Sequence, residues 1–298
     1  MSDSFTNADY PGLYQTADSE STASQGAYFR CLSWFLILLV LGSMANLIAG
    51  DSSPGAFMAA LLFFGSLLSS GLIAWKRYDR TWYSARAVAE SVKTITWRYA
   101  MRAEPYHHTD DQQATEQFLA VLNEILQENQ HVTKELCDES ASSDAVSTRM
   151  MELRALPIQD RLEFYMKERV EEQGGWYLRK ARHNKRGGAK WFIAVVALNA
   201  LAIACAVLRA AHSHWTYIPT NVLAVAAASA VSWLHAKRFT ELSTSYALTA
   251  HEINIGRTRA EMVQSEADLS QFVSNTENAF SREHTQWAAK RDPRCRTR

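Results

Sequence analysis

The chain has 298 residues, of which 31 are basic and 31 are acidic, so its formal net charge at pH 7 is zero. This balance excludes a general electrostatic attraction to nucleic acid, and we expect no nucleic-acid partner. The mean hydropathy of −0.22 resembles that of a soluble protein. The apolar residues are nevertheless gathered into four runs with long polar stretches between them, as expected of a chain that crosses a lipid bilayer.

The N-terminal segment, residues 1–27, is rich in Ser, Thr, Asp and Ala and predicts a flexible tail. The first apolar run, residues 31–50, and the second, residues 56–75, contain no charged residue. Each is long enough as a helix to cross about 30 Å of hydrocarbon, and the first is too long for a signal peptide. A Pro-Gly turn lies in the short connector between them and predicts an antiparallel transmembrane hairpin.

Two further apolar runs, residues 191–208 and residues 217–234, repeat this arrangement across a second short connector. The alternative interpretation is a pair of buried helices in a soluble bundle. Uncharged runs of about 18–20 residues seldom occur in such bundles, so we predict a second transmembrane hairpin. Small residues at four-residue spacing in the last run favour close helix packing; they are Ala224, Ala228 and Ser232.

Basic residues near the ends of the apolar runs predict the orientation of both hairpins. They follow the second and fourth runs and precede the third, whereas the connectors between paired runs carry only Arg209 and two histidines. Both tips are therefore expected to face outward, with both termini and the central segment in the cytoplasm. The cluster before the third run suits a topology signal with lipid-headgroup contact or, alternatively, an anionic-ligand contact: Arg179, Lys180, Arg182, Lys185 and Arg186.

The four runs contain no Asp, Glu, Lys or Arg, which disfavours an ion-coupled transporter. Weakly polar side chains remain, and they suit either contacts between helices or the lining of a neutral pore. Four spans leave little room for a wide channel, so a pore would require several chains. The candidate residues are Asn46, Ser66, Ser69, Ser70, Asn199 and Ser232.

The polar stretches between the runs carry helical patterns. From Tyr78 to Tyr99, apolar residues recur at alternating steps of four and three and predict that the membrane helix continues as a packed cytoplasmic rod. Residues 115–132 predict an amphipathic helix. Pro157 suits the start of a further helix, which Gly174-Gly175 should interrupt before the third run. The apolar face of the amphipathic helix consists of Phe118, Leu119, Leu122, Ile125 and Leu126.

The last segment, Lys237 to about Arg291, holds a heptad register that breaks between Ala267 and Leu269 and predicts a kink or a change of packing partner there. The tripeptides Lys76-Arg77-Tyr78 and Lys237-Arg238-Phe239 close the two hairpins and indicate an internal repeat. We therefore predict two variants of one module. The predicted boundaries are 28–137 for the first module, 138–156 for a connecting loop and short helix, and 157–298 for the second module.

No motif for enzymatic chemistry stands out: the chain lacks a phosphate-binding Gly-rich loop, His-Glu-x-x-His and Gly-x-Ser-x-Gly. We therefore expect no enzyme activity, no catalytic residues and no cofactor. The pairs His107-His108 and His212-x-His214 do not supply three ligands, so no metal site is predicted. The four cysteines show no Cys-x-x-Cys spacing and are expected to be reduced; they are Cys31, Cys137, Cys205 and Cys295.

Three motifs resemble those of the bacterial SLATT family, in its tandem form with two modules in one chain. Ala89-Glu90-x-x-Lys93-x-x-x-Trp97-Arg98-Tyr99 follows the first hairpin, and Gln173-x-x-Trp176-Tyr177-x-x-Lys180-Ala181 precedes the second. The closing Glu277-x-x-x-Ser281-x-Glu283-His284-x-x-Trp287 is similar to the C-terminal signature of the family. The resemblance covers about residues 28–291 and implies an all-α protein with two transmembrane hairpins and long cytoplasmic helices.

The resemblance also implies a function. SLATT domains are membrane effectors associated with nucleotide-signalling systems, so it implies a role in bacterial conflict, including antiphage defence, at the inner membrane. The expected partners are the lipid bilayer, further copies of the chain, and a nucleotide second messenger or an upstream sensor protein. The alternative is a membrane-anchored helical scaffold or signal-relay protein. Transport of a small neutral solute is a third interpretation, based on the weakly polar residues of the spans.

Overall fold

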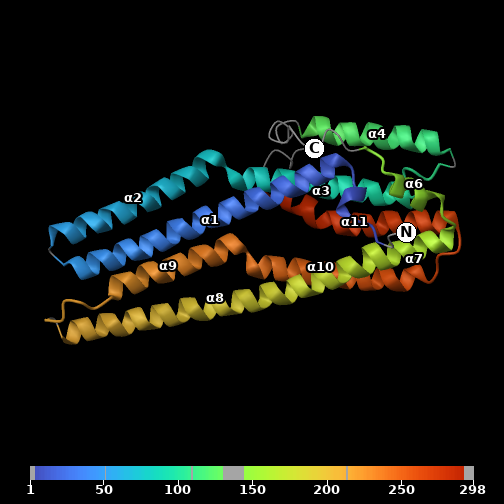
Figure 1. Ribbon diagram of the computed structural model, residues 1–298. Coiled ribbons are helices and arrows are strands. Elements are labelled where there is room, and N and C mark those ends of the chain that lie inside the picture. The colour runs from blue at the N-terminus through green and yellow to red at the C-terminus, as the bar shows by residue number, and fades with distance from the viewer. Residues whose placement is uncertain (1–3, 51, 109, 130–143, 213, 292–298) are drawn as a thin grey trace. The chain divides into compact units, whose positions relative to one another are not determined.

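The computed structural model describes residues 4–50, 52–108, 110–129, 144–212 and 214–291, with side chains as far as Ser281, and every regular element in these ranges is a helix (Figure 1). The predicted all-α fold class is therefore confirmed. The chain forms two compact units. Unit 1 consists of Met1–Ser24, Asp79–Arg179 and Ser245–Arg298, and unit 2 consists of Gln25–Tyr78 and Lys180–Thr244.

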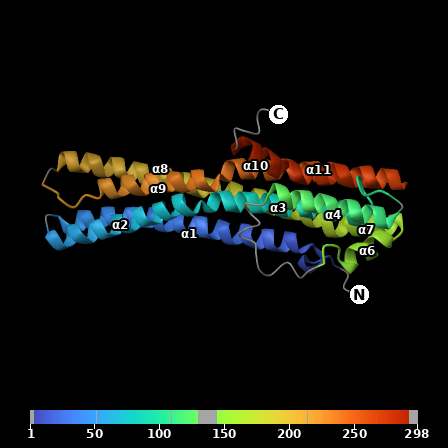
Figure 2. The same cartoon turned by 90° about the horizontal axis from the view of Figure 1, so that it is seen from above.

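Unit 2 contains the apolar runs, in two pairs of neighbouring helices. The later part of α1 (Gly12–Ala49) runs antiparallel to α2 (Ser53–Lys76), and the later part of α8 (Glu172–Ala211) runs antiparallel to α9 (Thr220–Lys237), as Figures 1 and 2 show. Glycine permits close packing in the first pair, because a Cβ on Gly42 would lie only 2.7 Å from the Phe63 ring.

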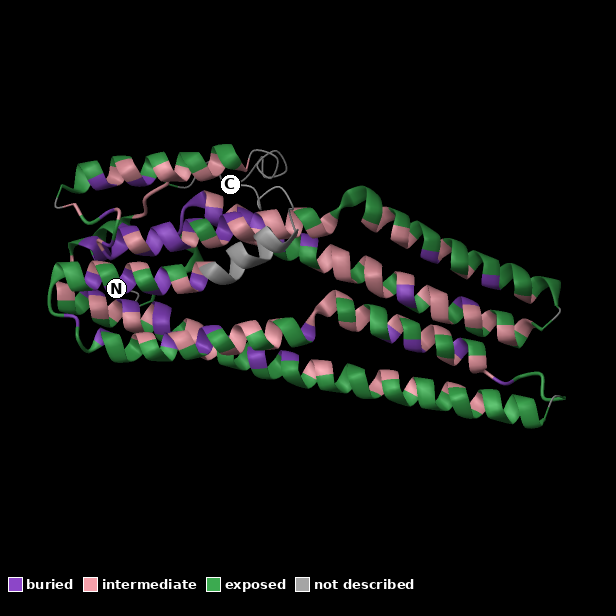
Figure 3. Cartoon of the chain, turned by 180° about the vertical axis from the view of Figure 1, so that it is seen from behind, coloured by how far each residue is buried: buried purple, intermediate pink, exposed green. Residues whose placement is uncertain are grey.

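The surface of unit 2 is unusually apolar. Three helical stretches are long and apolar enough to cross a membrane: Gly12–Ala49, Ser53–Ala100 and Ile158–Ala211. In their most apolar windows only 11%, 11% and 0% of the residues are buried, and Figure 3 shows this exposure. An apolar surface of this extent requires lipid around it, so the protein is membrane-associated. The helix α9 has 18 residues and falls outside this group, so its crossing of the membrane stays a prediction.

The second helix of each pair ends at an arginine in the left-handed conformation. Arg77 has φ 49° and ψ 40°, and Arg238 has φ 51° and ψ 38°. Their backbone N–H groups donate to the carbonyls of Ile73 and Leu234 and close the last turn of each helix. The second span is followed directly by a further helix, as predicted, but one residue, Arg77, separates α2 from α3 (Tyr78–Ala100).

Unit 1 is a packed helical bundle, and Figure 3 shows that buried residues are concentrated in its helices. The predicted stripe along α3 faces its core, since Ala85, Ala89, Val92, Thr96 and Tyr99 are all buried. The other elements of this unit, with the first part of α1 and of α8, are η1 (Asn7–Asp9), α4 (Asp111–Glu128), α6 (Thr148–Ala155), α7 (Ile158–Tyr165), the π-helix η3 (Met166–Glu171), α10 (Phe239–Ala260) and α11 (Glu266–Arg291).

The prediction of a flexible N-terminal tail is wrong for the described residues 4–27. They form η1 and the start of α1, and Tyr10 and Tyr14 are buried beside Trp97 of α3. The physical reason is a short heptad pattern, which is hard to recognise in the sequence because two of its positions are serines. Residues at alternating steps of four and three are buried throughout it: Tyr10, Tyr14, Ala17, Ser21 and Ser24.

Three further expectations need correction. Gly174-Gly175 does not interrupt α8, because a Cβ at Gly174 would lie 3.2 Å from Ile253 and the glycine allows this close packing within the helix. Leu119 of the predicted apolar face is 41% exposed. The segment 138–143 of the predicted connecting loop lies outside the described residues.

The C-terminal segment is two helices rather than one rod with a kink. It breaks at residues 261–265, slightly before the predicted position, and α11 then runs antiparallel to α10 (Figure 1). A reciprocal cap starts α11: the Asp268 carboxylate accepts from the Ser265 N–H at 3.0 Å, and the Ser265 hydroxyl accepts from the Asp268 N–H at 3.2 Å. The hydroxyl of Ser265 and the backbone N–H groups of Gln264 and Ser265 all donate to the Asp268 carboxylate and lower its pKa, so the carboxylate is charged and the cap is present at neutral pH.

The left-handed arginines allow a matched test. We expect Arg77→Gly to be more stable than Arg80→Gly by about 1–2 kcal/mol, because glycine relieves the left-handed strain at residue 77 but weakens the helix at residue 80. Both variants lose one positive charge within the same four residues. Thermal unfolding of the purified protein in detergent measures the difference. Equal unfolding temperatures for the two variants would contradict the conformational assignment.

Candidate functional site

A fully buried ion pair lies at the centre of unit 1. Arg169 of η3 donates through Nε and Nη2 to the two carboxylate oxygens of Glu277 on α11, at 2.9 and 2.8 Å. The side chains of Arg169 and Glu277 are 2% and 0% exposed. The hydroxyl of Tyr165 also donates to Glu277 at 2.9 Å. The first residue of the C-terminal family motif therefore connects three segments of unit 1.

The charges of this pair stabilise each other in the absence of water. Burial alone would lower the pKa of Arg169, but the carboxylate of Glu277 outweighs this effect and the pKa is raised. Burial and the Glu277 charge raise the pKa of Tyr165 well above its usual value. Tyr165 is therefore held as a neutral hydrogen-bond donor at physiological pH, and Arg169 remains a cation.

The α3 motif packs against the N-terminal segment. The indole N–H of Trp97 donates to the Tyr10 hydroxyl at 2.9 Å, and the Lys93 amine lies 5.9 Å from the ring centroids of Tyr10 and Tyr14. Burial, together with the positive charge of Arg169, lowers the pKa of Lys93. Burial, helped by nearby carboxylates, raises the pKa of Tyr14 to about 12. Lys93 of the motif thus lies beside two aromatic rings, in a buried position that disfavours its charged form.

Two other buried arginines satisfy backbone carbonyls beyond the end of α3. Arg154 donates to the carbonyls of Tyr99, Tyr106 and His108, and it forms an ion pair with Asp111 at 2.8 Å. The Tyr99 carbonyl also accepts from the Arg102 N–H at 3.2 Å, and the guanidinium of Arg154 supplies further donors to the carbonyls at and beyond the end of α3. Arg161 serves other carbonyls in the same way; its acceptors are Leu156, Met101 and the carboxylate of Glu266.

Sequence reasoning missed Arg154, Arg161 and Arg169. Their spacing does not distinguish a buried arginine from a solvated one, and charged residues on a helix are usually exposed. The contribution of Tyr10 and Tyr14 was missed for a different reason, since a heptad signal was present in a segment rich in small polar residues. The motif positions Glu283, His284 and Trp287 lie outside the described side chains.

The predicted polar residues of the spans have different positions. Ser66 and Ser69 of α2 donate to the Phe35 and Cys31 carbonyls of α1, at 3.2 and 2.8 Å, so they join the two helices. Asn46 is exposed. The other three donate to carbonyls of their own helices, and of these Asn199 and Ser232 are exposed; the bonds are Ser70 to Leu67, Asn199 to Val195 and Ser232 to Ala228.

The basic cluster and the small-residue row also lie on helix surfaces. All five basic residues of the cluster, from Arg179 to Arg186, are exposed along α8. Ala224, Ala228 and Ser232 are exposed on α9 and do not serve packing within the chain. Among the residues that the structure describes, no three His, Cys, Asp or Glu side chains converge on a candidate metal position.

The regular elements of the described residues are all helices, and they comprise long apolar helices with little burial and a bundle with a hydrophobic core and a buried ion pair; this combination defines a helical membrane-associated protein. Residues 11–162 match the SMODS and SLOG-associating 2TM effector domain 3, and residues 165–287 match the SMODS and SLOG-associating 2TM effector domain 1. The chain therefore belongs to the SLATT family and carries two modules in tandem, as the motifs predicted. No curated protein and no solved structure matches it.

The two modules do not coincide with the two compact units. The first match covers α1 to α6 and most of α7, and the second covers α8, α9, α10 and most of α11. Each unit draws helices from both of these ranges. The modules are thus interleaved: one compact unit holds the apolar helices of both, and the other holds the motif-bearing helices of both.

The buried ion pair predicts a large stability effect. We expect Glu277→Ala to cost about 3–5 kcal/mol of unfolding free energy, because it leaves the Arg169 charge buried without a partner. The control is Glu171→Ala, which removes an exposed ion pair with Arg257 at 3.1 Å and should cost at most about 1 kcal/mol. Thermal unfolding in detergent compares them. A Glu277→Ala protein as stable as the Glu171→Ala protein would refute this role.

Proposed function

We propose that the protein is a membrane effector of a bacterial defence system, which assembles from several chains and permeabilises the inner membrane in response to a nucleotide-derived signal. The observation that carries this proposal is the pair of 2TM effector modules, together with three long apolar helical stretches whose most apolar windows are at most 11% buried. In the proposed topology all four apolar helices cross the bilayer, and both termini are cytoplasmic. At 18 residues, α9 would span about 27 Å, close to the thickness of the hydrocarbon core.

The exposed polar residues of the spans support assembly. An amide that faces hydrocarbon is costly unless it finds a partner or water, and Asn46 and Asn199 are exposed in a single chain. Contacts between chains, or a shared aqueous lumen, would satisfy their remaining hydrogen-bonding capacity. The exposed row Ala224, Ala228 and Ser232 suits close packing against a helix of another chain.

The signal input is proposed for the basic cluster of α8. Its side chains, from Arg179 to Arg186, are exposed, so a phosphate-bearing ligand has access to them. The cluster begins two residues after Tyr177, whose ring contacts those of Tyr246 and Phe280 in unit 1. The input would therefore lie on the helix that also carries the third apolar run.

The permeability test compares the two asparagines with an asparagine outside the apolar runs. Expression in bacteria should depolarise the membrane once the protein is activated, and Asn46→Leu or Asn199→Leu should reduce depolarisation several-fold, because leucine removes a polar group from the proposed lumen. The control is Asn254→Leu, an exposed residue of α10, which should leave depolarisation unchanged. A membrane-potential dye provides the measurement, with protein abundance checked by immunoblotting.

Purified protein in dye-loaded liposomes provides the matching test in vitro. Dye should be released when an activating nucleotide or sensor is supplied. Liposomes that stay intact with every activator, together with an unchanged membrane potential in cells, would exclude the pore.

A second candidate function, a membrane-anchored scaffold, is favoured by exposed apolar residues on α10 and just beyond its end. Leu248 and Ile255 of α10 and Met262, two residues after this helix, are spaced by seven residues and are 61%, 59% and 70% exposed. Such a stripe suits a partner helix. The scaffold would be supported if the full chain captured a specific cytosolic protein, if Ile255→Lys abolished this capture, and if the chain left the membrane potential unchanged.

A further inference from the structure

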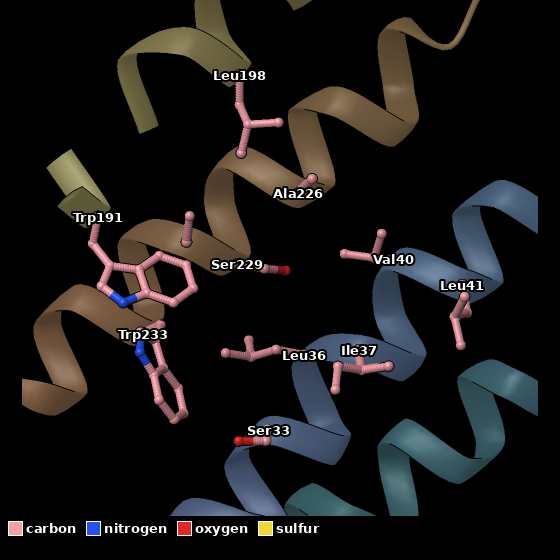
Figure 4. Close-up of a pocket in the computed structure, with 11 residues that line it drawn as sticks. Ser33, Leu36, Ile37, Val40, Leu41, Trp191, Leu198, Ala226, Ser229 and Trp233 are labelled. Carbon is pink, nitrogen blue, oxygen red and sulfur yellow. The ribbon is translucent and has the colours of Figure 1, made fainter. Parts of the chain in front are cut away.

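Unit 2 contains a groove of about 410 Å³ between α1, α8 and α9, shown in Figure 4. Aliphatic side chains line its length, among them Ile37 and Val40 of α1, Leu198 of α8 and Ala226 of α9. The tryptophans Trp191 and Trp233 lie together near one end, with ring centroids 6.0 Å apart. The groove is therefore apolar along most of its length and has an aromatic end.

The dimensions of the groove limit its occupant. Along α1 the lining extends from Ser33 to Leu41, a rise of about 12 Å, which is most of one bilayer leaflet. A flexible acyl chain is narrow enough and chemically matched to the lining.

The tryptophan end of the groove is basic. The Lys237 amine lies 3.5 Å from the ring centroid of Phe29 and 5.0 Å from that of Trp233. Among the described residues, no carboxylate lies within ion-pair distance of Lys237; Glu241 pairs with Arg238 instead. Lys190 directly precedes Trp191 in the sequence. Tryptophan and lysine at the end of an apolar helix mark the level of the lipid headgroups, where phosphate is the available anion.

We propose that unit 2 binds an anionic phospholipid, with one acyl chain in the groove and the headgroup phosphate beside Lys237. The inference rests on the membrane topology in the proposed function, since the tryptophan end must lie at the cytoplasmic interface. Anionic lipid is selected because its phosphate charge is not cancelled by a headgroup cation, as it is in phosphatidylcholine, and this uncancelled charge would lie beside Lys237. The only acidic residues in the sequence ranges of unit 2 are Asp51 and Glu241, whereas its basic residues are many.

Native mass spectrometry of the full chain tests the proposal, with phosphatidylglycerol and phosphatidylcholine supplied separately in detergent. The wild-type protein should retain phosphatidylglycerol in preference. Lys237→Met should weaken this preference about fivefold, the equivalent of about 1 kcal/mol for one lysine near an anionic surface. The matched control is Lys76→Met, at the corresponding position of the first module. The Lys76 amine also lies over a tryptophan, Trp75, but Trp75 does not line the groove.

Filling the groove should remove lipid of both kinds. Ala226→Phe is expected to reduce lipid retention at least several-fold, whereas Ala197→Phe, at an exposed position of α8 outside the groove, should not. Val40→Phe is a second groove variant, for use if Ala226→Phe does not fold. Undiminished retention in a folded groove variant, or an unchanged preference in Lys237→Met, would overturn the proposal. So would a groove variant that changes the oligomer mass but retains its lipid.

The outcomes separate this inference from the proposed function. Selective lipid retention by a protein that never permeabilises liposomes would leave the lipid site intact and refute the pore. Permeabilisation by a protein that retains no lipid in the groove would refute the lipid site alone.

Discussion

The carboxylate of Glu277 meets the guanidinium of Arg169 out of contact with water, and the arrangement of unit 1 depends on this pair. Removing two charges from water costs several kcal/mol for each ion, and good geometry is needed to offset that cost. Here two parallel hydrogen bonds join the charges, and Tyr165 adds a third to the carboxylate. Because η3 and α11 supply the two partners, neither segment can shift without exposing an uncompensated charge. The pair thus fixes the register between segments 108 residues apart in the sequence.

The interleaving of the modules gives this register a wider consequence. Each compact unit takes helices from both matched ranges. A single module would therefore supply only part of the helices of each unit. The arginine Arg169 belongs to a π-helix, a rare conformation that is frequent at functional sites, and α8 begins directly after it. That helix continues without a break to Ala211, so a rearrangement of η3 must either be absorbed within α8 or be carried along it.

Several parts of this structure could be predicted from the sequence because they depend on local pattern. The apolar runs, the stripe on α3 and the two modules follow from periodicity and from the repeated Lys-Arg-aromatic tripeptide. The left-handed arginines could not be predicted, since only the observed backbone shows that Arg77 and Arg238 end their helices. The burial of Arg154, Arg161 and Arg169 depends on carbonyls and carboxylates far away in the sequence. Among the candidate pore residues, Ser66 and Ser69 form hydrogen bonds between α2 and α1. The composition of the spans could not show whether these serines join helices or line a pore.

The zero net charge of the chain conceals a division between the units. Unit 2 holds the basic residues that flank the apolar runs but, in its sequence ranges, only Asp51 and Glu241 as acids, so most carboxylates belong to unit 1. In unit 1 these carboxylates serve the arginines of the bundle, as Glu277 and Asp111 do. The basic residues of unit 2 have few carboxylates of the same unit to pair with. A chain that is neutral overall can therefore still attract anions strongly at the level of the membrane surface, since electrostatic attraction there depends on the local charge and is screened within about 8 Å at physiological ionic strength.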